Sequence, residues 1–553
     1  MPLDFEPDRE SPHQLAGGWD LSFIGLRATF GNRIWGLDLK TKGFFSLGPA
    51  VLVTAAFVGP GTLMAASSAG AQFGYQLLWA VAFSVFATVV LQEMASRLGI
   101  VTGTGLSESL KQSISNSALR MCALALVLLA IFVGNSAYQT GNILGAASGM
   151  MSAYSKSDAP TDDARSPVDP ALKPEPAPSA SSLENLDEAN SLAGQNYIVL
   201  FVAAVALCVV WIGRFDVLQW LLTALVVLMS LLFIVAAIRS GADWNQVVKG
   251  FVPHIPSGAD WIVIGLVGTT VVPYNLFLHA SAAAQRWSGD SEADGKVSLG
   301  EKYASAIVES RWDTILSVMI GGLITCAILI TASAAFHGST GTEGLAKVSD
   351  VARQLEPALG SWAKQLFSMG LLAAGLTSAI TAPVAAAYAA SGCFGWSGKL
   401  SDPRLKIAAS VVVLTGAVFA IQLGGSPKET IILAQVANGL LLPIVAVALL
   451  ILTNDGQLMK KFKNGRLANI FAVLVILIVS VIAVNQFRKV GAILPAVGRT
   501  YWSTSKKLTA HGRPRGDMTS NSGVVTRHRF TLCTQCAQST AAHFPEMRSM
   551  RRR

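Results

Sequence analysis

Long apolar runs recur along this chain at short intervals. An α-helix needs about 20 apolar residues to cross the hydrocarbon core of a bilayer, and about eleven runs qualify. They cover residues 47–69, 76–96, 121–150, 197–213, 217–238, 261–285, 313–336, 365–391, 405–423, 430–452 and 468–487. A soluble helical protein would show apolar stripes at a 3.6-residue period with charges on the opposite face. These runs are apolar on every face, so the pattern predicts an all-α polytopic membrane protein with about eleven transmembrane helices.

The composition agrees with that prediction, and the net positive charge lies almost entirely in the last part of the chain. Of 553 residues, 52% are hydrophobic and only 14% are charged, against roughly 25% charged in soluble domains. The net charge of +9 suggests at first an anionic partner. Residues 1–487 hold 29 basic and 31 acidic residues, whereas 488–553 hold 13 basic and 2 acidic residues. The predicted membrane core is therefore nearly neutral, and we expect no nucleic acid partner.

Lysine and arginine in the short loops set the expected orientation. Basic residues precede the first run and follow the second, fourth, eighth and tenth runs, which places the N-terminus in the cytoplasm under the positive-inside rule. We expect a multi-pass protein of the cell (inner) membrane, in contact with the lipid bilayer. The basic tail either binds anionic lipid or is an extension without function, and the second interpretation is favoured.

This orientation divides the chain into five predicted parts. They are a cytoplasmic N-terminal segment (1–46), a first transmembrane repeat (47–238) with a disordered outer loop (151–196), a second repeat (239–452), a loop with the eleventh span (453–487), and a basic, disordered tail (488–553). The outer loop is rich in Pro, Ala and Ser, which is typical of disorder. Nothing in the sequence fixes the oligomeric state.

Two of the runs carry residues that break a helix in mid-span. The first contains Gly59-Pro60-Gly61-Thr62, and the sixth contains Pro273 between Val272 and Tyr274-Asn275. Unwound backbone is costly in lipid and is tolerated where it lines a cavity. Either break alone would be a tolerated kink. Because the two runs are five apart, as in a pair of inverted five-helix repeats, we interpret both breaks as one substrate site.

Around these breaks the sequence resembles the Nramp family of divalent metal transporters. The resemblance runs from Gly48 to about Asn485 and is specific because several motifs match in order. They are Phe73 to Trp79, Arg97 to Gly103, Gly268 to His279, Arg311-Trp312-Asp313-Thr314, Gly370 to Leu376 and Ala434-Gln435-Val436. The resemblance implies a LeuT-like fold of inverted five-helix repeats and transport by alternating access. No nucleophile–base arrangement or phosphate loop indicates an enzyme, and we expect no cofactor.

The chain departs from the family at the residues that carry its chemistry. The first-span motif of the family, Asp-Pro-Gly-Asn, reads Gly59-Pro60-Gly61-Thr62 here, and its Met-Pro-His reads Val272-Pro273-Tyr274. The acidic pair that the family uses for proton transfer aligns with Asn135 and Tyr138. The resemblance therefore implies a site without its usual carboxylate, thioether and imidazole, and transport that is not proton-coupled by the usual route.

The remaining donors favour a hard cation over manganese or iron. Hydroxyl, amide and carbonyl oxygens suit magnesium or calcium, whereas a thioether suits softer metals. An ion without anionic ligands pays a desolvation cost, so we expect it to stay partly hydrated. The expected substrate-binding residues are Ala56, Gly59, Pro60, Gly61, Thr62, Val272, Pro273, Tyr274, Asn275 and Gln435, with Thr62, Asn275 and Gln435 as metal ligands.

Two further interpretations stay open. A carrier of a neutral or anionic small solute would use the helix N-termini after each break as donors, and the loss of the acid at Gly59 favours it. His279 either serves the site or contacts a neighbouring helix. Gln139, Asn142 and Asn438 either face the cavity or pack between helices. Glu93 and Arg97, four residues apart, are predicted to form an ion pair.

Overall fold

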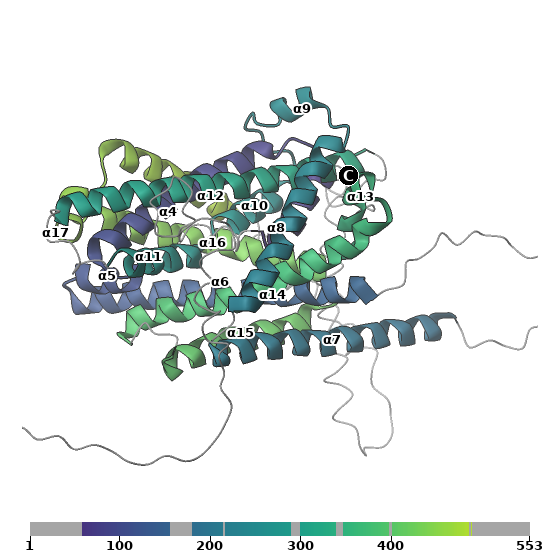
Figure 1. Cartoon of the computed structure of the whole chain (residues 1–553), viewed down its shortest axis with the longest axis horizontal. Helices are drawn as coiled ribbons and strands as arrows, with labels where there is room; N and C mark the ends of the chain where they lie inside the picture. The colour runs from purple at the N-terminus through teal and green to yellow at the C-terminus, as the bar shows by residue number, and fades with distance from the viewer. Residues whose placement is uncertain are drawn as a thin grey trace, which may run out of the picture. The chain divides into compact units, whose positions relative to one another are not determined.

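A computed structural model describes residues 58–154, 180–213, 216–288, 299–338, 345, 347–396, 401–485 and 488. Within these residues the chain is helical and contains no strand. Its helices lie roughly side by side as a bundle (Figure 1). The described bundle belongs to one compact unit, Met1–Gln486.

The helices follow the predicted runs closely. Those of the first half are α3 (Pro60–Phe73), α4 (Leu78–Thr102), α5 (Leu106–Ser113), α6 (Ser117–Tyr154), α7 (Ala180–Ile212) and α8 (Asp216–Arg239). Those of the second half are α9 (Trp244–Lys249), α10 (Asp260–Thr270), α11 (Pro273–Ser288), α12 (Leu299–Phe336), η2 (Val348–Leu355), α13 (Glu356–Leu359), η3 (Gly360–Trp362), α14 (Ala363–Phe394), α15 (Pro403–Leu423) and α16 (Pro427–Asn454). The chain continues through α17 (Gly456–Met459), η4 (Lys460–Phe462) and a last helix, Arg466–Asn485.

Ten helical segments of the described chain are long and apolar enough to cross a membrane. Each overlaps one of the predicted runs from the second to the eleventh, so the membrane prediction is confirmed for those runs. The first run is represented by α3, which has 14 residues. Residues 47–57 of that run lie outside the described residues.

Helices extend into both ends of the stretch 151–196, which the sequence predicts as a disordered loop. Residues 151–154 close α6, and residues 180–196 form the first half of α7. The stretch after Ala180 is rich in Leu, Glu and Ala, which are strong helix formers, although its acidic residues made it look like part of a polar loop. The rest of that loop, the N-terminal segment 1–46 and all of the tail except residue 488 lie outside the described residues.

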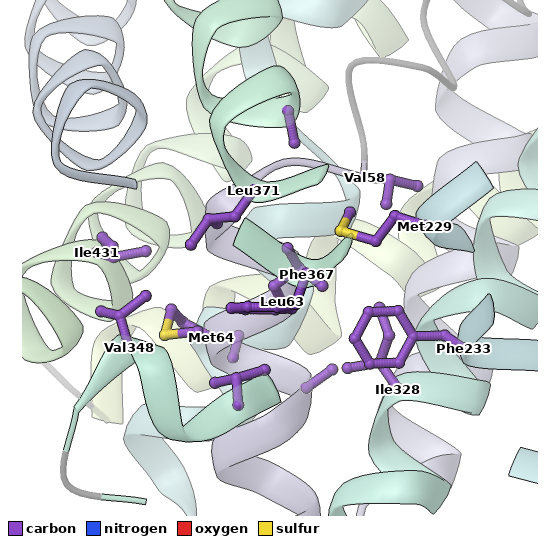
Figure 2. Close-up of a cluster of buried hydrophobic side chains, with 14 of the residues drawn as sticks. Val58, Leu63, Met64, Met229, Phe233, Ile328, Val348, Phe367, Leu371 and Ile431 are labelled. Carbon is purple, nitrogen blue, oxygen red and sulfur yellow. The ribbon is translucent and has the colours of Figure 1, made fainter. Parts of the chain in front are cut away.

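Helix α3 lies in the middle of the largest apolar cluster. Figure 2 shows Leu63 and Met64 of α3 among side chains of α8, α12, α14 and α16. Leu63, Met64 and Phe367 have no exposed surface. In a membrane this packing stabilises through close van der Waals contact, because lipid tails are as apolar as these side chains. The contacts fix α3 directly after its break at Gly59.

Helices α10 and α16 cross at two glycines. A Cβ at Gly268 would collide with the carbonyl oxygen of Gln435 and lie 2.6 Å from the backbone nitrogen of Gly439. A Cβ at Gly439 would lie 2.7 Å from the carbonyl oxygen of Ile264. The crossing therefore requires both glycines, and it sets Gln435 of α16 against the helix that precedes the second break.

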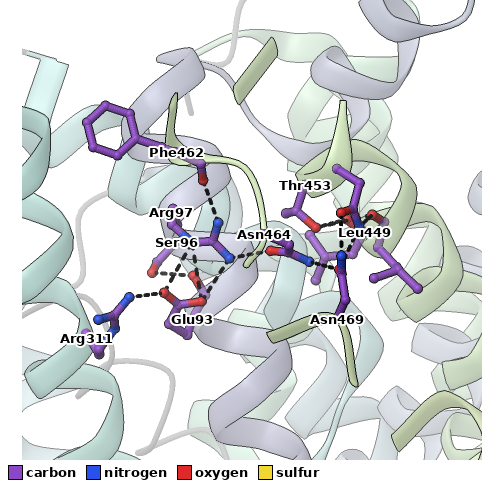
Figure 3. A network of polar contacts seen from close by, with 11 residues as sticks. Glu93, Ser96, Arg97, Arg311, Leu449, Thr453, Phe462, Asn464 and Asn469 are labelled. Atoms are coloured by element: carbon purple, nitrogen blue, oxygen red, sulfur yellow. Dashed lines mark hydrogen bonds and ion pairs between the residues drawn. The ribbon is translucent and has the colours of Figure 1, made fainter. Parts of the chain in front are cut away.

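A charged network ties the helices together where α4 ends. Glu93 accepts hydrogen bonds from Arg97 and Arg311, and Arg97 also donates to the Phe462 carbonyl at 2.7 Å and to Asn464 Oδ1 at 2.6 Å (Figure 3). The predicted pair of Glu93 and Arg97 is confirmed at 3.1 Å. We call these five residues the Glu93 network. It lies at the end of the bundle that holds α5 and α17, here named the α5 end (Figure 1).

Candidate functional site

The first predicted break coincides with a helix start inside the bundle, and residues 47–57 before it lie outside the described residues. Helix α3 begins at Pro60, after Gly59 in an extended conformation (φ −95°, ψ 178°). The first amide groups of a helix have no partner within it, and Pro60 at the first position has no N–H to lose. Gly59 is buried, and the first turn of α3 contains no acidic residue. The positive end of the α3 dipole therefore lies in the interior without a compensating carboxylate on that turn.

The second break separates α10 from α11. Helix α10 ends at Thr270, Val271 leaves the helical region (φ −99°, ψ 74°), and α11 begins at Pro273. The Val271 amide still donates to the Val267 carbonyl at 2.8 Å, and the Asn275 amide donates to the Val272 carbonyl at 3.1 Å. Pro273 provides no N–H to continue the α10 ladder, which explains where the helix stops. The last carbonyls of α10 thus point into the bundle.

The two breaks meet through a pair of threonines. The Thr62 and Thr269 hydroxyls are hydrogen-bonded at 2.9 Å although 207 positions separate them. The side chain of Gln435 packs against Gly61, next to Thr62, because a Cβ on Gly61 would collide with its side-chain amide. We call Gly59–Thr62, Thr269–Asn275 and Gln435 the junction. It combines the N-terminus of α3 with the C-terminus of α10.

Val272 and Tyr274 form a second group beside the first. They are fully buried with Tyr138 of α6 and with Ala382 and Ala385 of α14. The Tyr138 and Tyr274 rings have centroids 5.4 Å apart and are tilted by 58°. The position that the resemblance matched to an acid in the third span is therefore occupied by an aromatic contact with the second break.

One face of α6 links the two groups. Tyr138, Gly141 and Gly145 follow helical spacing and lie on the same side of α6. Tyr138 contacts Tyr274, a Cβ at Gly141 would lie 3.8 Å from Gln435 Nε2, and a Cβ at Gly145 would collide with Pro60. The face passes from the second break to the first, so α6 fixes their relative position.

Two of the three predicted metal ligands have polar atoms without partners. Both amide atoms of Asn275 and the Oε1 of Gln435 lack hydrogen bonds in the described structure, and both side chains have no exposed surface. Buried polar groups are nearly always paired with protein, water or a ligand. A bound cation or its water would satisfy the two oxygen atoms, and water would satisfy the Asn275 Nδ2 donor.

Of the other polar candidates, some hydrogen-bond to the backbone of a helix and others have no hydrogen-bond partner within the described chain. Gln139 donates to the Ala379 carbonyl at 2.9 Å, and Asn135 donates to the Ile131 carbonyl at 3.0 Å, which are packing contacts. His279 and Asn142 are fully buried, and no polar side-chain atom of either has a hydrogen-bond partner within the described chain.

The structure brings together some of the predicted site residues and not others. Gly61, Thr62 and Gln435 meet, and Val272 and Tyr274 meet through Tyr138. Asn275 makes no hydrogen bond to Thr62 or Gln435, and Ala56 lies outside the described residues. The sequence interpretation missed Thr269 as a site residue, although it lies in the sixth-span motif one turn before Pro273.

No group of three or more His, Cys, Asp or Glu side chains that could hold a metal occurs among the residues that the structure describes. The junction offers uncharged oxygen donors instead, from Thr62, Thr269, Asn275 and Gln435. Such a set favours an ion that keeps part of its water shell, because neutral oxygens replace only part of the hydration energy of a divalent ion.

Comparisons with known proteins agree with this architecture. Residues 50–156 and 180–488 match the family model described as natural resistance-associated macrophage protein-like, Nramp. The chain is 28% identical over 430 residues to divalent metal cation transporter MntH 1 of Pseudomonas aeruginosa, covering 76% of this chain and 86% of that one. It is 28% identical over 454 residues to MntH of Ralstonia nicotianae, covering 80% and 91%.

A solved structure supports the fold. The manganese transporter of Eremococcus coleocola, crystallised as the mutant H236A, superimposes with a TM-score of 0.60 at 20% identity, covering 83% of this chain and 93% of that one. The fold is LeuT-like, as predicted. With three quarters of its length matched by the family model, the chain belongs to the Nramp family.

Proposed function

We propose that this protein is a secondary transporter that moves a divalent metal cation across the membrane by alternating access. The observation that carries the proposal is the contact between the two breaks, Thr62 to Thr269, deep inside the bundle. Two interrupted helices that meet in mid-membrane form the binding site in transporters built from inverted repeats. The MntH relatives are named divalent metal cation transporters, which supports the same substrate class.

The cation is held in the junction by neutral oxygens. Thr62, Asn275 and Gln435 supply side-chain ligands, and the carbonyl end of α10 adds partial negative charge. None of these side chains is a carboxylate or a thioether. The finer part of the proposal is therefore a hard, partly hydrated ion such as magnesium in preference to manganese. The structural relative named a manganese transporter makes this preference the part most worth testing.

Transport does not depend on the proton route of the family. That route requires acidic groups at the positions of Asn135 and Tyr138, and neither side chain carries a carboxylate. Asn135 uses its amide to bond its own helix, and Tyr138 packs on Tyr274. A substrate-dependent inward proton current in liposomes would contradict this part of the proposal.

A second candidate is transport of a neutral or anionic small solute. It is favoured by the N-terminus of α3, which lies in the junction with no acidic residue in its first turn. Helix N-termini bind anions through free amide groups and the helix dipole. The two candidates differ in the sign of charge that the junction accepts.

Calorimetric titration of the purified protein tests the proposal. Magnesium, calcium and manganese are titrated in turn, and the titrations are repeated on the double variant Gly59→Asp with Val272→Met. The extended conformation of Gly59 accommodates aspartate without strain. We expect magnesium to bind the parent more tightly than manganese, and manganese to gain most from the double change.

The outcomes separate the candidates. If no divalent cation binds the parent while the double variant binds manganese, metal transport fails as the natural function and the solute carrier is favoured. If the parent binds manganese more tightly than magnesium, the hard-cation preference fails while divalent transport stands. Uptake into liposomes with each ion completes the test.

A further inference from the structure

A separate polar cavity lies at the α5 end. It measures about 90 Å³ and lies between the turn joining α4 to α5, α11 and α14. That volume has room for several water molecules. Its polar lining comes from Thr104, Ser107, Glu108, Ser281, Gln285, Tyr388 and Ser391. None of these residues belongs to the junction.

The faces of α11 and α14 that pack on the tyrosines also line the cavity, farther toward the α5 end. On α11, Tyr274 and Leu278 pack in the tyrosine group, and Ser281 and Gln285 line the cavity. These four positions follow helical spacing and share one face. On α14, Ala382 and Ala385 pack on the tyrosines, and Ala389 and Gly392 line the cavity in the same manner. At 1.5 Å per residue, the seven positions from Tyr274 to Ser281 span about 10 Å.

Glu108 brings a negative charge to this cavity. Its Oε2 accepts a hydrogen bond from the Gly105 amide at 3.2 Å, which caps α5. Within the described residues, none of the ion pairs involves Glu108, and its side chain is half-buried. Lys111 follows one turn later on α5. The Glu108 carboxyl group therefore lies at the wall of the cavity, held there by the amide at the start of its own helix.

Ser107 provides a second, independent sign of a ligand. It lines the same cavity and is 2% exposed, and its hydroxyl has no hydrogen-bond partner within the described chain other than a contact with the Cys393 thiol. A thiol is a weak hydrogen-bonding group, so a bound water or ion in the cavity would satisfy this buried hydroxyl better. Carboxylate and hydroxyl oxygens together are suitable ligands for a hydrated divalent cation.

We propose that the cavity bounded by Ser107, Glu108 and Ser281 is a second cation site, occupied by the ion on its way between the junction and the α5 end. The inference rests on the proposed function, because it places this site on the route of the same substrate. It provides the carboxylate that the junction lacks. Tyr138 and Tyr274 pack together on the faces of α11 and α14 that lead from the junction to the cavity.

The test is protection of a cysteine at Ser281, which is partly exposed in the cavity. The six native cysteines are replaced, Ser281→Cys is introduced, and the full-length protein in liposomes reacts with a water-soluble methanethiosulfonate reagent. Magnesium and manganese are the probes. We expect saturating ion to slow the reaction at least fivefold. Glu108→Gln, which keeps the cap on α5 because glutamine also accepts from the Gly105 amide, removes this protection.

Glu356→Gln is the matched control, because Glu356 is an exposed acid on α13, away from the cavity. This control keeps the protection. If Glu108→Gln protects as well as the parent, the second site is overturned. Uptake of the same ions by the Ser281→Cys parent separates the two proposals. Uptake with unchanged protection in Glu108→Gln defeats only the second site, whereas absence of uptake and binding with every divalent ion defeats the proposed function.

Discussion

Buried polar side chains gather in two regions of this bundle, the Glu93 network at the α5 end and the junction in the middle. In the network the groups are charged and paired: Glu93 accepts from two arginines, and Arg97 also reaches Phe462 and Asn464. In the junction the groups are uncharged, and atoms of Asn275 and Gln435 have no partner.

The difference in pairing distinguishes a structural role for the Glu93 network from the ligand-binding role that we propose for the junction. A buried charge costs free energy unless it is paired and hydrogen-bonded, so the network is stable only when complete. An uncharged amide without a partner costs about 1–3 kcal/mol, which a passing ion or water can recover. The network therefore holds α4 to α12 and to the chain after α17, while we propose that a ligand completes the junction. Four predictions test this contrast.

The largest effect is expected at the crossing that holds the junction together. Gly268→Ala places a Cβ against the carbonyl oxygen of Gln435. This oxygen belongs to the backbone of α16, so it cannot move away without shifting the helix. We expect a loss of about 3 kcal/mol or more and loss of transport. Thermal unfolding of purified protein and ion uptake measure both effects.

Gly265→Ala is the control for that substitution. It lies one turn earlier on α10, and its Cβ would make only an ordinary contact with Val436 at 3.8 Å. The substitution should leave stability unchanged or raise it slightly, because alanine favours helix over glycine. Equal stability of the two variants would show that the crossing is looser than described.

The second prediction breaks the network. Arg97→Met removes five hydrogen bonds, three to Glu93 of the same helix and two to Phe462 and Asn464 after α17. Arg311 still pairs with Glu93, so we expect a loss of about 2–3 kcal/mol, below the full cost of an unpaired buried charge. Arg286→Met breaks an exposed pair with Glu309 and should cost less than about 1 kcal/mol. Similar melting temperatures for both variants would contradict the contrast.

The sequence predicts most of the frame of this site because membrane spans and breaks are local signals. Ten of the spans, the breaks at Pro60 and Pro273 and the pairing of Glu93 with Arg97 depend only on residues close in the chain. The contact of Thr62 with Thr269 and that of Gln435 with Gly61 depend on how distant helices are rotated and shifted. No local pattern contains that information. The first half of α7 was missed because its acidic residues resemble a loop.

The third prediction concerns the junction itself. Thr62→Val keeps the shape of the side chain and leaves the buried Thr269 hydroxyl without its bond. We expect a loss of about 1–2 kcal/mol in stability and about tenfold weaker binding of magnesium, measured by calorimetry. Thr325→Val on α12 removes a hydroxyl that bonds only the Gly321 carbonyl. This control should affect stability and leave ion affinity unchanged.

The smallest effect is a pH dependence at the α5 end, outside the membrane spans. The Ser113 hydroxyl donates to Asp455 at 2.6 Å, and this bond, with those from the Gln457 and Leu458 amides, lowers the pKa of Asp455 below its usual 3.8. A lowered folded pKa stabilises the protein above the unfolded pKa, and that stability is lost as pH falls through the folded value. Because Asp455 is only partly buried and solvent screens its interactions, we expect less than about 1 kcal/mol.

Ser113→Ala isolates that contribution. The variant should unfold slightly earlier than the parent at pH 7, and the difference should shrink as pH falls below 3.8 and through the lowered pKa of Asp455 in the folded state. Magnesium affinity at the junction should stay constant between pH 7 and pH 5, because Thr62, Asn275 and Gln435 do not titrate there. A fall in magnesium affinity over this pH range would contradict the prediction, because it would require a titrating group in the junction that the described residues do not place there.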